Sequence, residues 1–282
     1  MNIFVTGATG KVGSHLVPRL LQRGHQVKVL IRDAAKAESS LLQSTEVVEG
    51  NLLQAKKLEE ALRNIDVVIH LAAQFRGVDE ETARSSNIDA TIVLARATMK
   101  AGVSRFVFAS TGLVYGSGGQ LRPHREDDEL QPGSLYPQTK ATAEDALRQL
   151  HAEQGLGLRI IRLGFVYGER DPHITEFLPH MRTWNPAQRL HMVHHSDVSQ
   201  ALLLAASTPG VDGRVYNVAD DAPISVAELF QFHEHSGHYP AEVSRSEYNP
   251  FELILDTNRI RNELNYRPIF PSFYTAKDAG AL

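Results

Sequence analysis

The chain has 282 residues, 42% hydrophobic and 22% charged, as expected for a globular protein with one large domain or one domain and a smaller lobe. The formal net charge of -4 argues against a nucleic-acid partner, and the absence of cysteine excludes disulfides, thiolate zinc sites and a cysteine nucleophile. No apolar run reaches the roughly 18 residues of a membrane helix, and a strand pattern begins at residue 2, which leaves no room for a signal peptide. We therefore expect a cytoplasmic protein with no membrane partner.

Strand and helix patterns alternate along the first two-thirds of the chain. Short runs rich in Val, Ile and Phe, apolar on both faces, predict buried parallel strands at 2–6, 26–31, 46–49, 66–71, 104–110 and 158–163. Helical patterns lie between them at 11–23, 54–63, 80–101 and 137–154. This alternation predicts an α/β fold with a doubly wound parallel sheet, the Rossmann type, and places ligands at the carboxyl ends of its strands.

The pattern weakens after residue 168. Residues 169–190 are polar and contain three prolines, a strand pattern returns at 214–219, and a helix pattern starts at 225–230. We predict that residues 1–168 and about 191–219 form a dinucleotide-binding Rossmann domain. The segments at about 169–190 and 220–282 are predicted to form a smaller substrate-binding lobe.

A glycine-rich turn follows the first predicted strand. Gly7, Gly10 and Gly13 separate that strand from the helix pattern that begins at Lys11. A strand, a tight glycine turn and a helix N-terminus form a binding place for a pyrophosphate, because backbone N–H groups point at the anion and the helix dipole favours its charge. The sequence therefore predicts a dinucleotide cofactor.

The residues after the second predicted strand bear on which dinucleotide binds. Arg32 can pair bidentately with the 2′-phosphate of NADP, whereas Asp33 lies near the position where a carboxylate would bind the ribose of NAD and repel that phosphate. We favour NADP over NAD on the basis of Arg32.

Three polar side chains are candidates for the chemistry. Tyr136 and Lys140 are four residues apart and share one face of a predicted helix, so Lys140 is placed to lower the pKa of Tyr136 and to donate to the ribose of the cofactor. Ser110 and Thr111 end a buried strand, where a hydroxyl can donate to a substrate oxygen. A cofactor site with an acid/base pair predicts a redox enzyme.

Six segments in this order resemble the extended type of the short-chain dehydrogenase/reductase superfamily, which includes nucleotide-sugar epimerases, dehydratases and reductases. The resemblance runs from residue 2 to about 268. Its segments read TGATGKVG at 6–13, DVVIHLAA at 66–73, STGLVYG at 110–116, YPQTK at 136–140, RLGFVYG at 162–168 and VHHSDV at 193–198.

The resemblance implies roles for individual residues. Thr111 takes the catalytic Ser/Thr role, Tyr136 is the general acid/base, and Lys140 orients the ribose and tunes Tyr136. Asn87 matches a position that the family often fills with Asn, and Ile31, where NAD-using epimerases tend to carry Asp, supports NADP. The implied cofactor-binding residues are Gly7, Thr9, Gly10, Lys11, Val12, Gly13, Arg32, Asp33, Asn51, Leu52, Leu71, Ala72, Ala73, Ser110, Tyr136, Lys140, Leu163 and Val166.

Three functions stay open. Dehydratases of the family carry an acidic pair where this chain has Gly112 and Leu113, which argues against dehydration. We predict an NADPH-dependent carbonyl reductase or alcohol dehydrogenase acting on a small organic substrate. One alternative is a nucleotide-sugar epimerase, which would need basic residues such as Arg182, Arg189 or Arg259 to hold a diphosphate. The other is a non-catalytic regulator that senses the cofactor, against which the intact Tyr136 and glycine turn argue.

Two further predictions concern metals and assembly. His191, His194 and His195 with Asp197 fit no standard zinc spacing, so we predict no metal and expect Asp197 to cap a helix at 198–206. Related proteins dimerise through helices equivalent to 80–101 and 137–154. We predict a homodimer through these helices, because the apolar residues Ile88, Ile92, Leu94, Ala95 and Met99 leave a face for a partner.

Overall fold

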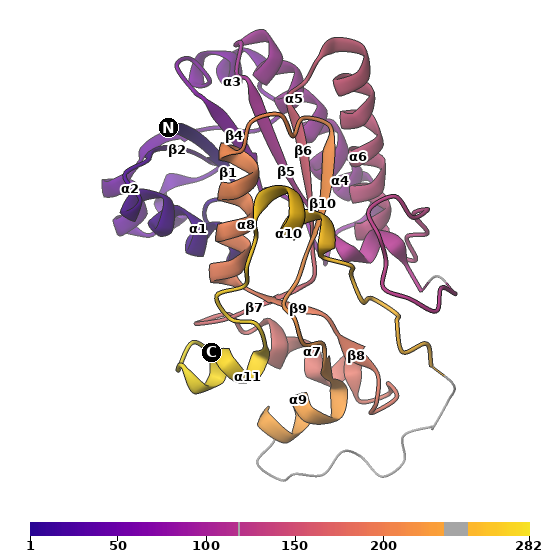
Figure 1. Cartoon of the computed structure of the whole chain (residues 1–282). Coiled ribbons are helices and arrows are strands. Elements are labelled where there is room, and N and C mark those ends of the chain that lie inside the picture. Colours follow the sequence, from indigo (N-terminus) through magenta and orange to yellow (C-terminus); the bar gives the residue numbers. More distant parts are fainter. Residues whose placement is uncertain (118, 234–247) are drawn as a thin grey trace.

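The computed structural model describes residues 1–117, 119–233 and 248–282. Its centre is a parallel sheet of seven strands in the order β10-β6-β5-β4-β1-β2-β3 (Figure 1). The strands are β1 (Asn2–Thr6), β2 (Gln26–Ile31), β3 (Glu46–Glu49), β4 (Val67–His70), β5 (Arg105–Thr111), β6 (Leu158–Leu163) and β10 (Arg214–Val218). The predicted doubly wound sheet is therefore confirmed, and strand order reverses between β1 and β4.

Helices cover both faces of this sheet. They are α1 (Lys11–Gln22), α2 (Ser39–Ser44), α3 (Ala55–Ala61), α4 (Glu80–Arg84), α5 (Ala90–Lys100), α6 (Leu135–Gln154), α8 (His195–Ser207) and α10 (Asn258–Leu264), with 3₁₀ turns at Ala34–Lys36 and Gly112–Tyr115. The predicted helix 80–101 is divided, because a π-helical segment at Ser85–Asp89 joins α4 to α5. Such π segments occur frequently at functional sites.

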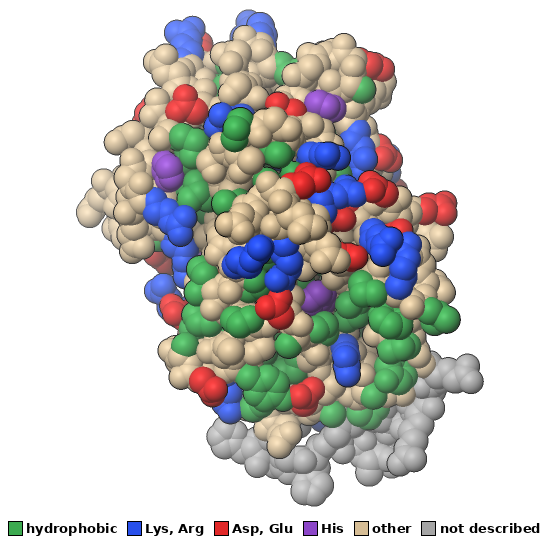
Figure 2. Space-filling model, viewed as in Figure 1, with side chains coloured by type: hydrophobic (Ala, Val, Ile, Leu, Met, Phe, Trp, Pro, Cys, Tyr) green, Lys and Arg blue, Asp and Glu red, His purple; other side chains and the backbone are tan. Residues whose placement is uncertain are grey.

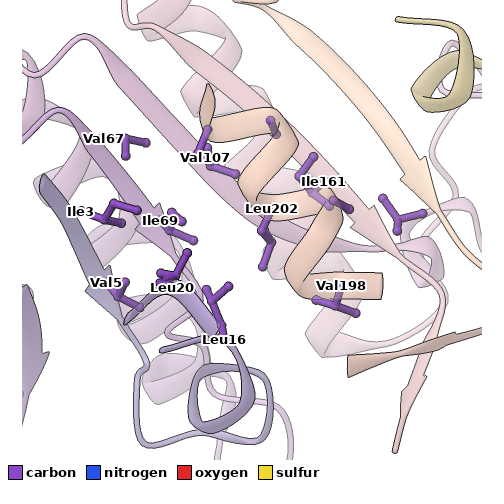
Figure 3. Close-up of a cluster of buried hydrophobic side chains, with 14 of the residues drawn as sticks. Ile3, Val5, Leu16, Leu20, Val67, Ile69, Val107, Ile161, Val198 and Leu202 are labelled. Carbon is purple, nitrogen blue, oxygen red and sulfur yellow. The ribbon is translucent and has the colours of Figure 1, made fainter. Parts of the chain in front are cut away.

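Alternate side chains of each strand enter two different cores. Ile3 and Val5 of β1 pack with α1 and α8 on one face, whereas Phe4 between them packs with α3, α5 and α6 on the other. Figure 3 shows the first of these cores, with Leu16 and Leu20 of α1 and side chains of α8 facing the strands. Burial on both faces explains why the strands read as continuous apolar runs.

A smaller lobe lies below the carboxyl ends of the strands in Figure 1. Its elements are β7 (Phe165–Tyr167), α7 (His173–Met181), β8 (Arg189–Leu190), β9 (Met192–His194), β11 (Ile224–Ser225), α9 (Val226–His233) and α11 (Phe273–Asp278). These elements share a core of their own, which contains Leu178, Leu229 and Phe273. Figure 2 shows hydrophobic side chains gathered mostly in the lower half of this face of the molecule, where the lobe lies.

The predicted extent of the lobe needs one correction. Helix α10 lies within the predicted segment 220–282, yet Ile260 and Leu264 are buried in the sheet core beside α8. Because a short amphipathic helix buries its apolar face against an available apolar surface, α10 packs on the sheet and not in the lobe. Residues 234–247, also assigned to the lobe, lie outside the described residues, as does Gly118.

The predicted dimer face is reduced in the structure. Leu94 and Ala95 of α5 are fully buried in the chain's own core, and Ile88 in the preceding π-helical segment is nearly so. These three residues therefore offer little surface to a partner, whereas Ile92 and Met99 are only partly buried. The homodimer itself stays a prediction.

Among the described helices, none combines the length and apolarity needed to cross a membrane.

Candidate active site

A cavity of about 440 Å³ opens between the carboxyl ends of the sheet and the lobe. Parallel pairing brings its walls together: Thr6 of β1 pairs with Leu30 and His70, so the turn at Gly7 lies between the ends of β2 and β4. Of the predicted site residues, those lining the cavity are Gly7, Gly10, Lys11, Val12, Gly13, Leu71, Ala73, Ser110, Thr111, Tyr136, Lys140, Leu163 and Val166. The structure therefore brings the predicted catalytic residues and most of the predicted cofactor residues to one cavity.

The glycine turn has the shape that a pyrophosphate site requires. A Cβ on Gly13 would lie 2.1 Å from the carbonyl oxygen of Gly7, and one on Gly7, where φ is +74°, would lie 2.6 Å from the backbone nitrogen of Ala72. Only glycine fits this close approach. The first N–H groups of α1, at Lys11, Val12 and Gly13, have no intrahelical partner and border the cavity. The turn and helix start thus fit the pyrophosphate of a dinucleotide.

Other predicted cofactor residues do not line this cavity, although Ala72 lies directly against Gly7. They are Thr9, Arg32, Asp33, Asn51, Leu52 and Ala72. Arg32 is exposed directly after β2, while the Asp33 carboxylate accepts a hydrogen bond of 3.1 Å from the backbone nitrogen of Ala35. Asn51 Oδ1 likewise accepts from the backbone nitrogen of Leu53 at 3.0 Å. The two side chains thus already accept hydrogen bonds from their own turns.

Tyr136 and Lys140 both face the cavity from the first turns of α6. Lys140 Nζ donates to the carbonyl oxygen of Ala109 at 2.7 Å and lies 4.3 Å from the centre of the Phe108 ring. Burial lowers the pKa of Lys140 to about 7, although the charge of Glu144 opposes this. Burial raises the pKa of Tyr136. The lowered Tyr136 pKa that we expected is therefore not found in the protein alone, because desolvation disfavours the phenolate.

The two hydroxyls at the end of β5 have different partners. Thr111 Oγ1 accepts from the backbone nitrogen of Leu113 at 3.2 Å, which leaves its proton available to a ligand. Ser110 Oγ donates to Glu144 Oε1 at 2.5 Å. Thr111 is thus placed for the predicted catalytic role, whereas the Ser110 proton is already engaged with Glu144.

A buried polar network behind Ser110 was not predicted from the sequence. Glu144 of α6 forms an ion pair of 2.6 Å with Arg162 of β6, and both side chains are almost fully buried. Arg162 also donates to the Tyr115 hydroxyl at 2.8 Å, and that hydroxyl donates to Asn217 Oδ1 at 2.7 Å. The network connects β5, β6, β10 and α6 next to the candidate catalytic side chains. The signal for it was the presence of arginine in a buried strand, since β6 reads LRIIRL.

Asn87 joins the loop after β4 to α6. It lies in the π-helical segment, where Oδ1 accepts from the backbone nitrogen of Gln74 at 2.7 Å. Its Nδ2 donates to Thr139 Oγ1 at 2.9 Å. Because Thr139 precedes Lys140, Asn87 positions the cavity wall and the catalytic helix relative to one another.

The late histidines are held apart by separate partners. His191 Nε2 lies 2.9 Å from the Asp220 carbonyl oxygen, and His194 Nδ1 accepts from the backbone nitrogen of Ser196. His194 therefore caps α8. The prediction that Asp197 caps this helix is wrong: α8 begins at His195, and the Asp197 carboxylate accepts from the backbone nitrogens of residues 269 and 270. Asp197 instead fastens the C-terminal segment to α8.

An ion-pair cluster that the sequence analysis missed ties the lobe to the glycine turn. Lys11 Nζ lies 3.2 Å from the Asp171 carboxylate and 2.8 Å from that of Glu176. Asp171 is also bonded to His195 Nε2 at 2.9 Å. Its pKa is lowered to about 2 by these hydrogen bonds and charges, which outweigh the effect of burial. The cluster closes one end of the cavity.

Comparison with known proteins places this site in a family. The model of the NAD dependent epimerase/dehydratase family matches residues 3–219. A ketoreductase from Stigmatella aurantiaca, which acts on a farnesyl dihydroquinoline oxide, is 31% identical over 80% of this chain and 70% of its own length.

Two similar solved structures are UDP-glucose 4-epimerases. The enzyme from Thermotoga maritima, with UDP-glucose, has a TM-score of 0.80 and 27% identity, covering 95% of this chain and 94% of that chain. The enzyme from Thermus thermophilus, in complex with NAD, has a TM-score of 0.78 and 26% identity, covering 95% and 94%. The chain thus belongs to the NAD-dependent epimerase/dehydratase family and is an enzyme of the extended short-chain dehydrogenase/reductase superfamily.

Proposed function

We propose that the protein interconverts a ketone and a secondary alcohol on a small, largely apolar substrate, with net transfer of hydride to or from the nicotinamide. The observation that supports this proposal most strongly is the apolar wall of the cavity that also contains Tyr136 and Thr111. That wall is formed by hydrophobic side chains of the lobe and its neighbouring segments, namely Phe165, Phe177, Trp184, Leu190, Leu253 and Leu255. Apolar walls with a few convergent polar groups are typical of small-molecule sites.

Each catalytic side chain has one task in this proposal. The cofactor, when bound, supplies or accepts the hydride. Thr111 donates its free proton to the substrate oxygen, and Tyr136 donates its phenolic proton to the alkoxide that develops there. The raised pKa of Tyr136 keeps that proton in place at neutral pH, as reduction requires. Lys140, whose pKa is about 7, exchanges protons readily with its surroundings.

A second candidate is a nucleotide-sugar epimerase. The comparisons favour it over a carbonyl reductase, because both solved structures described above are named UDP-glucose 4-epimerases. Such an enzyme must hold a diphosphate. The three arginines that we predicted for this task do not line the cavity: Arg182 and Arg189 are exposed, and Arg259 is paired with Glu126 and Asp127. These three arginines are therefore not placed to hold a diphosphate in the cavity.

Consumption of NAD(P)H separates the two candidates. The purified protein is mixed with NADPH or NADH and with medium-chain and aryl ketones, or with NAD or NADP and with either UDP-glucose or UDP-galactose. We expect absorbance at the nicotinamide wavelength to fall with apolar ketones. Conversion of one UDP-sugar into the other without net cofactor consumption would establish the epimerase instead.

NADP is our proposed cofactor, whereas the comparisons support NAD use by relatives. Replacing Arg32 with Ala should weaken NADPH binding by tenfold or more, because a charged hydrogen bond contributes roughly 1.5–3 kcal/mol. NADH affinity should stay unchanged. Titration by nicotinamide fluorescence measures both. Loss of NADH and NADPH affinity in equal proportion, or no loss at all, would contradict the role of Arg32.

A further inference from the structure

Most polar side chains on the lobe side of the cavity are already engaged by the protein. Asp171 is held by Lys11 and His195. His191 has a partner for each ring nitrogen, since Nε2 faces the Asp220 carbonyl oxygen and Nδ1 accepts from the backbone nitrogen of Leu255. These groups are therefore not available to a substrate.

Arg76 differs from them. It lies on the loop after β4, is exposed, and lines the cavity. Within the described parts of the chain, no carboxylate forms an ion pair with its guanidinium. Two acidic residues of the lobe, Asp171 and Glu176, are both paired with Lys11. Arg76 thus brings an uncompensated positive charge to the cavity entrance.

Two aromatic rings hold this guanidinium. Its central carbon lies 4.5 Å from the centre of the Phe75 ring and 4.9 Å from that of Phe177. Phe75 in turn packs edge-on against Tyr136, with ring centres 4.7 Å apart. Stacking on aromatic faces fixes the plane of a guanidinium and leaves its N–H groups directed outward. The Phe75 ring therefore contacts both the Arg76 guanidinium and the ring of Tyr136.

His173 adds no competing cation. Its Nδ1 lies 3.1 Å from the Val166 carbonyl oxygen and its ring stacks on Phe165. Burial lowers the pKa of His173 and outweighs the opposing effects of the Val166 carbonyl and the Asp171 charge, so the imidazole is neutral at neutral pH. With Lys11 paired and His173 neutral, Arg76 is the cation best placed for a substrate at this end.

We propose that Arg76 is a specificity-determining residue that binds an anionic group, a carboxylate, on the apolar substrate whose oxygen is held by Tyr136 and Thr111. The inference rests on the proposed function and names its substrate class as ketones that carry a carboxylate. A planar guanidinium matches two carboxylate oxygens bidentately. A phosphate presents the same chemistry and is separated by the test.

Trp184 supplies a direct readout, because it is the single tryptophan of the chain and lines the cavity beside Phe177. The protein, saturated with the oxidised cofactor, is titrated with 6-oxoheptanoate, with its methyl ester and with 5-oxohexyl phosphate while Trp184 emission is followed. The variants are Arg76→Gln, Arg76→Lys and the matched control Arg63→Gln, an exposed arginine outside the cavity.

We expect 6-oxoheptanoate to bind the wild type about tenfold to a hundredfold more tightly than Arg76→Gln. Arg76→Lys should be intermediate, and the ester should bind every variant alike. If 5-oxohexyl phosphate binds more tightly than 6-oxoheptanoate and this affinity is lost in Arg76→Gln, the anion site at Arg76 is supported and its ligand is a phosphate. The proposal is overturned if acid and ester bind alike, if no probe changes the emission, or if Arg76→Gln loses oxidised-cofactor affinity by the same factor.

The proposed function can fail separately. Binding that depends on Arg76 without any consumption of NAD(P)H would leave this site in place and reject the reductase. Consumption of NAD(P)H by the ketones with equal KM in wild type and Arg76→Gln would reject the role of Arg76 alone.

Discussion

Replacing Tyr136 with Phe should lower kcat by roughly 10²- to 10⁴-fold, because the variant loses the proton donor to the developing alkoxide. The phenol ring and its edge-on contact with Phe75 are retained, so the cavity wall should keep its shape. NAD(P)H affinity should therefore stay within about twofold of the wild type. Steady-state kinetics with the ketone that is consumed fastest measures the first effect, and nicotinamide fluorescence measures the second.

Tyr274→Phe is the matched control. Its hydroxyl contacts Glu228 on the exposed side of the lobe, away from the cavity. This variant should keep the activity of the wild type. If Tyr136→Phe retained more than about a tenth of that activity, Tyr136 would not be the proton donor and the assignment of the site would be wrong.

Replacing Arg162 with Met should lower the free energy of unfolding by about 3–5 kcal/mol. The change leaves the Glu144 carboxylate buried with its main charged partner removed, and an uncompensated buried charge is strongly destabilising. Urea denaturation followed by circular dichroism measures the loss. A second variant, Arg162→Met combined with Glu144→Leu, should recover most of it, because both charges are then removed.

Arg148→Met tests whether burial is the cause. Arg148 also lies within 3.8 Å of Glu144 but is exposed to solvent, so its removal should cost at most about 1 kcal/mol. Equal losses for Arg148→Met and Arg162→Met would show that the buried network does not carry the stability assigned to it.

The sheet was predictable because its signals are local. Apart from the edge strand β3, the strands are buried on both faces and so appear as short, mostly apolar runs, and Gly7, Gly10 and Gly13 mark the turn at the start of α1. Tyr136 and Lys140 were predictable for the same reason, since helical spacing alone puts both on one face.

The partners of these residues were not predictable. Lys140 is bonded to a backbone carbonyl of β5, and Ser110 to Glu144 of α6, which are contacts between elements far apart in the sequence. Desolvation, which raises the Tyr136 pKa instead of lowering it, is likewise a property of the assembled fold. Asp197 was assigned to a helix cap from its position, whereas its partners come from residues more than seventy positions later.

The lobe was the least predictable part. Its strands β7, β8, β9 and β11 have only two or three residues each, too few for a periodic pattern. Arg76 carried no signal either, because its stacking on Phe75 and Phe177 depends on where the lobe meets the sheet.

Transfer of deuterium from the cofactor tests the central proposal most directly. The protein is incubated with NADPH or NADH deuterated at C4 of the nicotinamide and with the best ketone, and the product is analysed by mass spectrometry. We predict that the wild type places one deuterium at the carbinol carbon of a secondary alcohol. The Tyr136→Phe variant should transfer deuterium only at its much lower residual rate. Interconversion of UDP-sugars with the oxidised cofactor and no net change in the cofactor, together with no labelled alcohol from any ketone, would contradict the reductase and establish the epimerase.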